Sequence, residues 1–269
     1  MKIFKKISTL VLSLSIAVGV VFCGNTEKSY AATAYKKKLV IGKIYKYDLD
    51  GDKDLDSIKV YSSGKKLLLK VNNTTKTLTT SYTPSYGYDY EVKIYDFNKN
   101  DKSLEIVYDW SGGSEWGTHI LKFKNNKCMV HKNYEDAILR SYDPKTGMVT
   151  FEEYDFGRYK SFSKAIGAFG VFSKVRVNGY NIYNQDTANT NDITKKNKYI
   201  TAKKLTAYTS TSGKKKAFTI NKGKKAYIYA LYQKGNNKYI KVKNSAGKYG
   251  YVKVGSSMLF TRNSCIYAR

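Results

Sequence analysis

The chain has 269 residues, 42% of them hydrophobic, and a formal net charge of +27 at pH 7. Twenty-six tyrosines and only two prolines favour strands and exclude a disordered chain, while three cysteines exclude a disulfide scaffold. The length suits two domains behind a short leader, and the residue usage predicts an all-β protein.

The first 34 residues have the three parts of a secretory signal peptide. Lysines precede an uncharged apolar run, Ile7 to Cys23, and Ala32-Thr33-Ala34 follows as a cleavage site. A membrane anchor is the alternative, but serines interrupt the run, which lies at the short end for a bilayer span. We therefore predict a secreted protein that loses residues 1–34 and keeps no transmembrane segment. Cys128 and Cys265 remain, either paired or as free thiols.

An aspartate ladder, DLDGDKDLD, occupies residues 48–56. Ca²⁺ takes six to eight oxygen ligands from such loops, and a bound cation would relieve the repulsion between the carboxylates. Lys59 stands where an EF-hand has its bidentate Glu, so the loop is not an EF-hand. We predict a weak, structural Ca²⁺ site, with a solvated acidic turn as the alternative. Its predicted ligands are Asp48, Asp50, Asp52 and Asp56 through their side chains, with Asp54 contributing its backbone oxygen or standing outside.

A second copy of this pattern follows 48 residues later. Asp96, Asn98 and Asn100 form a weaker loop, and a fainter third copy begins at Asp143. A period near 48 residues is typical of propeller blades. Strands are predicted on both sides of the first two loops and after the third, at residues 44–47, 57–61, 92–95, 104–108 and 148–156.

The pattern D-x-D/N-x-D/N followed by an apolar strand resembles the FG-GAP and VCBS-type repeats of extracellular propellers. The resemblance implies blade-like β units with calcium loops over residues 35–194. Three units are fewer than an ordinary closed ring contains, so a partial or small propeller is expected.

The segment DWSGGSEWGTH, residues 109–119, holds both tryptophans of the chain. Trp110 and Trp116 are predicted either to stack on a glycan or to fill the space between sheets. Catalytic groups are scarce, because His119 and His131 are the only histidines. The alternative to a binding protein is an exported hydrolase that gathers His119, Glu115 and one of the carboxylates of residues 152–155.

Residues 195–269 contain 19 Lys and Arg and no acidic residue, whereas residues 35–194 hold 25 basic and 20 acidic residues. A surface of one sign confined to one domain indicates contact with a polyanion. Short strands separated by turns predict a small barrel in this domain. The five predicted strands cover residues 204–208, 217–220, 226–232, 238–243 and 249–254.

KYIKVKNSAGKYGYVKV, residues 238–254, resembles the closing half of a bacterial SH3-type (SH3b) domain. INKGKKAYIYA, residues 220–230, is similar to the hairpin upstream of it. The resemblance implies a small SH3-like barrel that attaches an exported protein to a bacterial cell wall. The candidate wall-binding residues are Lys241, Lys243, Lys248, Lys253, Tyr239, Tyr249 and Tyr251.

Together these features predict a non-catalytic protein that is secreted and associated with the wall of a Gram-positive type bacterium. The expected partner is a wall polymer, either peptidoglycan or teichoic acid. Nucleic acid would suit the charge but would be an incidental ligand outside the cell. The hydrolase alternative keeps the basic domain as a targeting arm.

Overall fold

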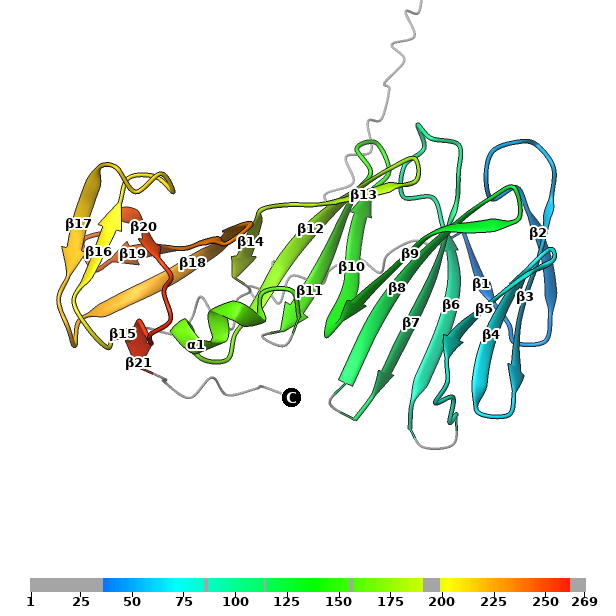
Figure 1. The fold of residues 1–269 in the computed structure, drawn as a ribbon, viewed down its shortest axis with the longest axis horizontal. Helices are drawn as coiled ribbons and strands as arrows, with labels where there is room; N and C mark the ends of the chain where they lie inside the picture. Colours follow the sequence, from blue (N-terminus) through cyan, green and yellow to red (C-terminus); the bar gives the residue numbers. More distant parts are fainter. Residues whose placement is uncertain (1–35, 85–86, 114, 155–156, 191–198, 262–269) are drawn as a thin grey trace, which may run out of the picture.

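The computed structural model describes residues 36–84, 87–113, 115–154, 157–190 and 199–261. Within these residues the chain is nearly all antiparallel β-structure, in three open sheets (Figure 1). The predicted all-β class is therefore confirmed. The predicted signal peptide and Cys265 lie outside the described residues, so the question of a Cys128–Cys265 pair stays open.

The first unit is a four-stranded sheet in the order β2-β3-β4-β5. Alternate residues of β4, Leu67, Leu69 and Val71, are buried, which gives the sheet one apolar face. The predicted strands at residues 44–47 and 57–61 are confirmed as β2 and β3. The strands are β2 (Ile44–Tyr47), β3 (Asp56–Ser63), β4 (Lys66–Val71) and β5 (Thr74–Thr79).

The second unit repeats the first and gains one strand, in the order β1-β6-β7-β8-β9. β1 precedes the first unit in the sequence but pairs with β6, with Lys37 opposite Ile94. The N-terminal segment thus ties the two units together. The strands are β1 (Lys37–Leu39), β6 (Asp89–Tyr95), β7 (Glu105–Gly112), β8 (Glu115–Lys124) and β9 (Lys127–Glu135).

The third unit confirms the strand predicted after Asp143, because β11 begins at Met148. A short connection with η1 (Lys160–Phe162) and α1 (Ser163–Ile166) joins β11 to β12. The strands are β10 (Ala137–Asp143), β11 (Met148–Tyr154), β12 (Gly170–Asn178), β13 (Asn181–Asn184) and β14 (Thr187–Thr190).

The C-terminal domain contains all five strands predicted for it, as β16 to β20. In β19, Ile240 and Val242 are buried, whereas Lys241 and Lys243 lie on the opposite face. The strands are β15 (Tyr199–Thr201), β16 (Leu205–Tyr208), β17 (Lys216–Ile220), β18 (Lys225–Lys234), β19 (Asn237–Asn244), β20 (Tyr249–Lys253) and β21 (Phe260–Thr261).

The predicted boundary near residue 194 falls between β14 and β15, but the packing continues across it. β14 pairs with β12 of the third unit and with β18 of the C-terminal domain, so one twelve-stranded sheet contains both parts. One hydrophobic core joins residues 159–188 to residues 199–260, and the Leu259 N–H donates to the Ala165 carbonyl at 3.0 Å. The third unit and the C-terminal domain therefore depend on each other for burial.

Two other cores lie between the sheets. One packs the first unit against the second, and the other packs the second against the third. The units follow one another across the molecule from β2 to β13, with the C-terminal domain beyond (Figure 1). In the described part of the chain, no helix has the length and apolar character needed to cross a membrane.

Candidate functional site

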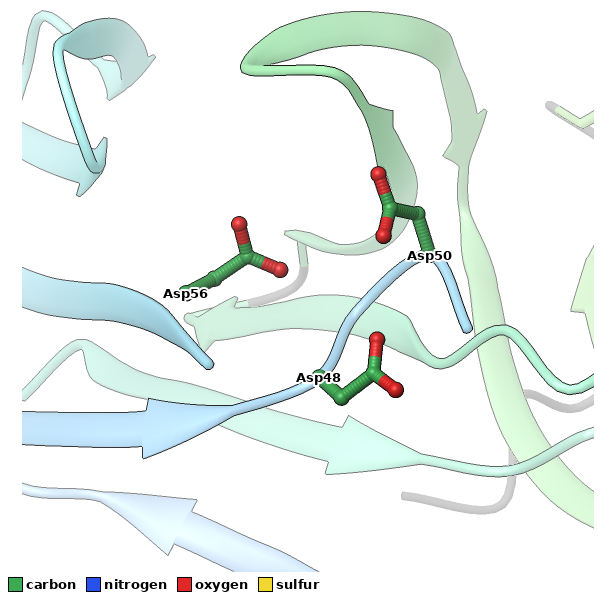
Figure 2. A group of neighbouring side chains, drawn as sticks. All are labelled: Asp48, Asp50 and Asp56. Atoms are coloured by element: carbon green, nitrogen blue, oxygen red, sulfur yellow. The ribbon is translucent and has the colours of Figure 1, made fainter. Parts of the chain in front are cut away.

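The Asp loop, residues 48–56 between β2 and β3, brings three of its five carboxylates together. One oxygen from each of Asp48, Asp50 and Asp56 lies within 4.8 Å of the others. Figure 2 shows the three side chains close to one another at this loop. Hard cations select oxygen donors in such an arrangement, so this group is the candidate metal site.

Backbone hydrogen bonds hold these three carboxylates in place. Asp48 accepts from the Gly51 N–H at 2.7 Å, and Asp56 accepts from the Leu49 N–H at 2.9 Å. The β8–β9 turn of the second unit donates the Asn125 N–H to Asp50 Oδ2 at 2.9 Å. The site therefore lies where the first unit meets the second.

The hydrogen bonding of one carboxylate oxygen in the candidate metal site supports the binding of a cation. Asp50 Oδ1 is buried and accepts no hydrogen bond, although buried oxygens almost always have a partner. Burial, with the neighbouring charges of Asp50 and Asp52, raises the pKa of Asp56 despite its hydrogen bonds. A divalent cation held by these carboxylates would supply the missing partner and offset the repulsion, so the residues fit Ca²⁺.

Asp52 and Asp54 do not belong to this group. The Asp52 carboxylate accepts the Asp54 N–H at 2.8 Å, and both residues are exposed. The prediction of Asp52 as a side-chain ligand is therefore not supported, because the turn that brings Asp48 and Asp50 toward Asp56 leaves Asp52 on the outside. Asp54 was predicted to contribute its backbone oxygen or to stand outside, and its carboxylate is not one of the three.

The second loop, residues 96–105, is organised by a lysine. Lys122 of β8 is fully buried, and its Nζ bonds Glu105 Oε1 and lies 3.4 Å from Asp101 Oδ2. Glu105 accepts the Phe97 N–H at 2.8 Å, as Asp56 accepts the Leu49 N–H in the Asp loop. Glu105 and Asp56 thus have the same place in the two loops, and the lysine ammonium supplies the positive charge in the second.

The side chains predicted for a weak ion site in the second loop make other bonds. Asn98 donates to the Val177 carbonyl at 3.2 Å and Asn100 donates to the Lys145 carbonyl at 3.0 Å. Asp96 lies 3.4 Å from Lys36 Nζ. These bonds attach the loop to the third unit and to the N-terminal segment.

The residue equivalent to Lys122 in the first unit explains the difference between the two loops. Lys122 lies three positions before the β8–β9 turn at Asn125, and Leu69 lies three positions before the β4–β5 turn at Asn72. Leu69 is buried and uncharged. The Asp loop therefore has no internal ammonium at this position, and a bound cation would supply the positive charge that Lys122 supplies in the second loop.

Calcium is expected to stabilise the protein through the Asp loop. With a dissociation constant on the order of 10⁻³ M, about 10 mM Ca²⁺ adds about 1.4 kcal/mol to the free energy of unfolding. The melting temperature should then rise by about 3–6 °C relative to EDTA, measured by circular dichroism. Asp50→Asn should abolish this rise and Asp54→Asn should keep it. A full response of Asp50→Asn to Ca²⁺ would show that the loop is only a solvated turn.

The C-terminal domain presents a lysine–tyrosine face, formed by Lys241, Lys243, Tyr229, Tyr249 and Tyr251. In the register of β19 and β20, Lys241 lies opposite Tyr251 and Lys243 lies opposite Tyr249. The Nζ atoms of Lys241 and Lys243 lie 5.3 and 5.5 Å from the centre of the Tyr249 ring. Tyr229 packs edge-on against Tyr249 at 4.9 Å. Cations and stacking rings therefore share one surface.

Of the other predicted wall-binding residues, the two lysines are exposed and the tyrosine is buried. Lys253 is exposed at the end of β20, and Lys248 is exposed in the turn before it. Tyr239 is only 8% exposed. Little of its side chain is therefore available for contact with a polymer.

An aromatic groove of about 1040 Å³ lies between the end of the first unit and one face of the second. Trp110, Glu115 and His119 line it, together with Tyr90 and Glu135. Trp116 reaches it from the opposite face of β8 and packs edge-on against Tyr154 at 4.9 Å. Both tryptophans, predicted either to contact a glycan or to pack between sheets, thus line one cavity, although only Trp110 belongs to its floor.

The residues of the hydrolase alternative are only partly brought together. His119 and Glu115 share the groove. Glu152 instead pairs with Arg140, and Glu153 is buried against Arg158 and Ser173. Asp155 lies outside the described residues. The described carboxylates predicted to complete that site are therefore occupied in structural pairs.

His119 and His131 form a pH-sensitive pair at the edge of the groove. His119 Nδ1 lies 2.9 Å from His131 Nε2. Burial, and secondarily the charge of His131, lowers the pKa of His119 to about 4. The ring is therefore neutral at pH 7.

Because of this histidine pair, the free energy of unfolding is expected to fall as the pH is lowered. Between pH 6.5 and about 4 the unfolded chain binds a proton that folded His119 does not, so the folded state loses about 1–2 kcal/mol after allowance for partial exposure. Urea unfolding at pH 7 and pH 4.5 measures the loss, which should be smaller in His119→Gln. Parallel pH curves for the two proteins would contradict the assignment.

The three features occupy different parts of the molecule: the Asp loop between the first and second units at the β8–β9 turn, the aromatic groove at the opposite end of β8, and the lysine–tyrosine face on the C-terminal domain. Each draws its residues from more than one strand or turn. Their interpretation depends on their own chemistry, because no family model, curated protein or solved structure matches this chain.

Proposed function

We propose that this is a secreted, non-catalytic protein that binds an anionic polymer of the bacterial cell wall through its C-terminal domain. The lysine–tyrosine face carries the proposal. Lys241 and Lys243 flank the Tyr249 ring, and residues 195–269 hold no acidic side chain to oppose them. A surface that served only solubility would mix both signs of charge.

Wall teichoic acid is the polymer class that suits this face best, because it is polyanionic and carries sugar groups on which tyrosine rings stack. The screening length is about 8 Å at physiological salt, so the lysines act mainly at contact. The half-exposed rings add an attraction that salt does not remove. We therefore expect binding that weakens with salt without vanishing.

The finer architecture is part of the proposal. We infer that the first three units form a partial propeller whose Asp loop is stabilised by Ca²⁺. We further infer that β15 to β21 form an SH3-like barrel. Their support is the repeated four-strand unit with its loop at each inter-unit contact, and the meander of β18, β19 and β20 with a Gly-Tyr-Val strand.

Sedimentation with isolated cell walls tests the proposal. The mature protein should pellet with walls that carry teichoic acid and should stay largely in solution with walls from which teichoic acid has been extracted. Equal pelleting with both preparations would contradict the choice of polymer, and no pelleting with either would contradict wall binding. Deletion of residues 195–269 is a poor test, because it would expose the core shared with residues 159–188.

A further inference from the structure

The floor of the aromatic groove is one face of the sheet of the second unit. The pairing of neighbouring strands places its side chains in rows across that sheet. Tyr90 lies opposite Trp110, Trp110 opposite Gly117, and Gly117 opposite Glu135. In the next row, Tyr108 lies opposite His119 and His119 opposite Asn133. Residues that are directly opposite in adjacent strands share a face, so these side chains form one continuous surface.

Two glycines allow aromatic rings to approach this surface closely. A Cβ on Gly117 would stand 2.5 Å from Trp110 Nε1, and a Cβ on Gly112 would stand 1.9 Å from the Tyr88 ring. Both approaches are closer than any larger residue permits. Tyr88 and Trp110 are only half-buried, so each ring covers its glycine and keeps part of its surface open to the groove.

The opposite wall is rich in hydroxyl groups and is fixed to the floor. Thr77, Thr79, Thr80, Ser81 and Thr83 line it. The Tyr90 hydroxyl donates to the Ser81 carbonyl at 3.1 Å and accepts from the Thr83 N–H at 3.3 Å. The groove is therefore formed in advance of any ligand, as binding sites usually are.

The charge of the groove is opposite to that of the chain. Glu115, Glu135 and Asp136 line it against one lysine, Lys65, in a protein of net charge +27. A polyanion would be repelled here and attracted to the lysine–tyrosine face. The groove thus selects a ligand without anionic groups.

We propose that the aromatic groove is an oligosaccharide-binding site for a glycan without anionic groups. Sugar rings stack on Tyr88 and Trp110, and their hydroxyls bond Glu115, Glu135 and the threonines of the wall. A peptide is the less suitable occupant, because the groove offers flat rings and dispersed polar groups in place of apolar side-chain pockets. This inference goes beyond the proposed function: it names a ligand for the second unit and does not require the lysine–tyrosine face.

Tryptophan fluorescence of the full mature chain provides a direct test, since both tryptophans of the protein line the groove. The probes are the β-1,4-linked tetramers of N-acetylglucosamine and of glucose, a mannotetraose, a tetragalacturonate as the anionic member, and a Lys-Tyr-Thr-Lys peptide. At least one neutral sugar should shift the emission in a saturable way, with affinity confirmed by calorimetry, and the galacturonate should not. No response to the neutral sugars, or a stronger response to the galacturonate or the peptide, would overturn the proposal.

Three variants locate the binding. Tyr88→Ala should weaken it at least tenfold, whereas Tyr183→Ala, at a tyrosine that is 52% exposed on β13, should leave it unchanged. Glu115→Gln, at an exposed position where folding is not at risk, should weaken it about three- to tenfold through a lost hydrogen bond. Unaltered affinity in both groove variants would place the sugar elsewhere and overturn the assignment. Because the probes are soluble, failure here leaves wall sedimentation unaffected.

Discussion

Replacement of Lys122 by methionine is expected to lower the free energy of unfolding by about 3–5 kcal/mol, a large part of a domain's total stability. Lys122 and Glu105 are both fully buried and bonded to each other. Methionine keeps the length of the side chain but removes the ammonium, so the Glu105 carboxylate would remain buried without its cation. Urea unfolding of the wild type and of Lys122→Met at pH 7 measures the effect.

The pH dependence of this variant separates loss of the cation from loss of packing. Burial raises the pKa of Glu105 to about 7 even though Lys122 opposes the shift. Without Lys122 the pKa rises further, and a carboxyl whose folded pKa is raised binds its proton more tightly in the folded state. Stability is then retained at low pH and lost as pH rises. The deficit of Lys122→Met should therefore be larger at pH 8 than at pH 5.

Two controls accompany this prediction. Lys132→Met changes an exposed lysine of the neighbouring strand β9 and should alter stability by less than about 0.5 kcal/mol. Lys122→Met combined with Glu105→Gln removes both charges and should recover part of the loss, as is found when both members of a buried pair are replaced. A deficit that is independent of pH and unchanged in the double variant would indicate a packing defect alone.

Substitution of Gln for Lys241, Lys243, Lys248 and Lys253 is expected to weaken binding to teichoic-acid-bearing walls on the order of 10²–10³-fold at low salt. A lysine near an anionic surface contributes about 1 kcal/mol, and the four positions are accessible at least in part. Depletion of the protein from solution by increasing amounts of wall gives the affinity. The difference between wild type and variant should shrink as salt is added, because screening removes the same attraction.

The matched control neutralises four exposed lysines of the first two units, Lys46, Lys66, Lys70 and Lys127. It removes the same net charge from a different surface and should retain most of the wall binding. An equal loss in both variants would mean that net charge alone attracts the protein. Unchanged binding in the C-terminal variant would contradict the proposed role of the lysine–tyrosine face.

The strands could largely be predicted from the sequence because their signals are local. In β19, Ile240 and Val242 alternate with Lys241 and Lys243, and this period of two determines both the strand and its buried face. The recurrence of an Asp or Asn loop before an apolar strand, at a spacing near 48 residues, likewise indicated the repeated unit. Such patterns require no knowledge of which segments meet.

The composition of the sites depends on contacts between distant segments. The spacing of the Asp ladder indicated a cation site, but the path of the loop selects Asp48, Asp50 and Asp56 and leaves Asp52 outside. Lys122 was missed as a functional residue. Its signal was a charged residue within the apolar run Ile120, Leu121 and Phe123, whose partner Glu105 could be identified only from the pairing of β7 with β8.

The sequence alone therefore determined the all-β class, the repeated unit, the strands of the C-terminal domain and the one-signed charge of that domain. The tertiary structure decided which carboxylates come close together, that the second loop holds a buried lysine, and that Tyr88 and Trp110 pack closely over glycines beside a groove. It also decided that the third unit and the C-terminal domain share a core. The physical reason is that hydrophobic periodicity acts within a segment, whereas neutralisation of charge and stacking of rings depend on strand register and on the packing of one unit against the next.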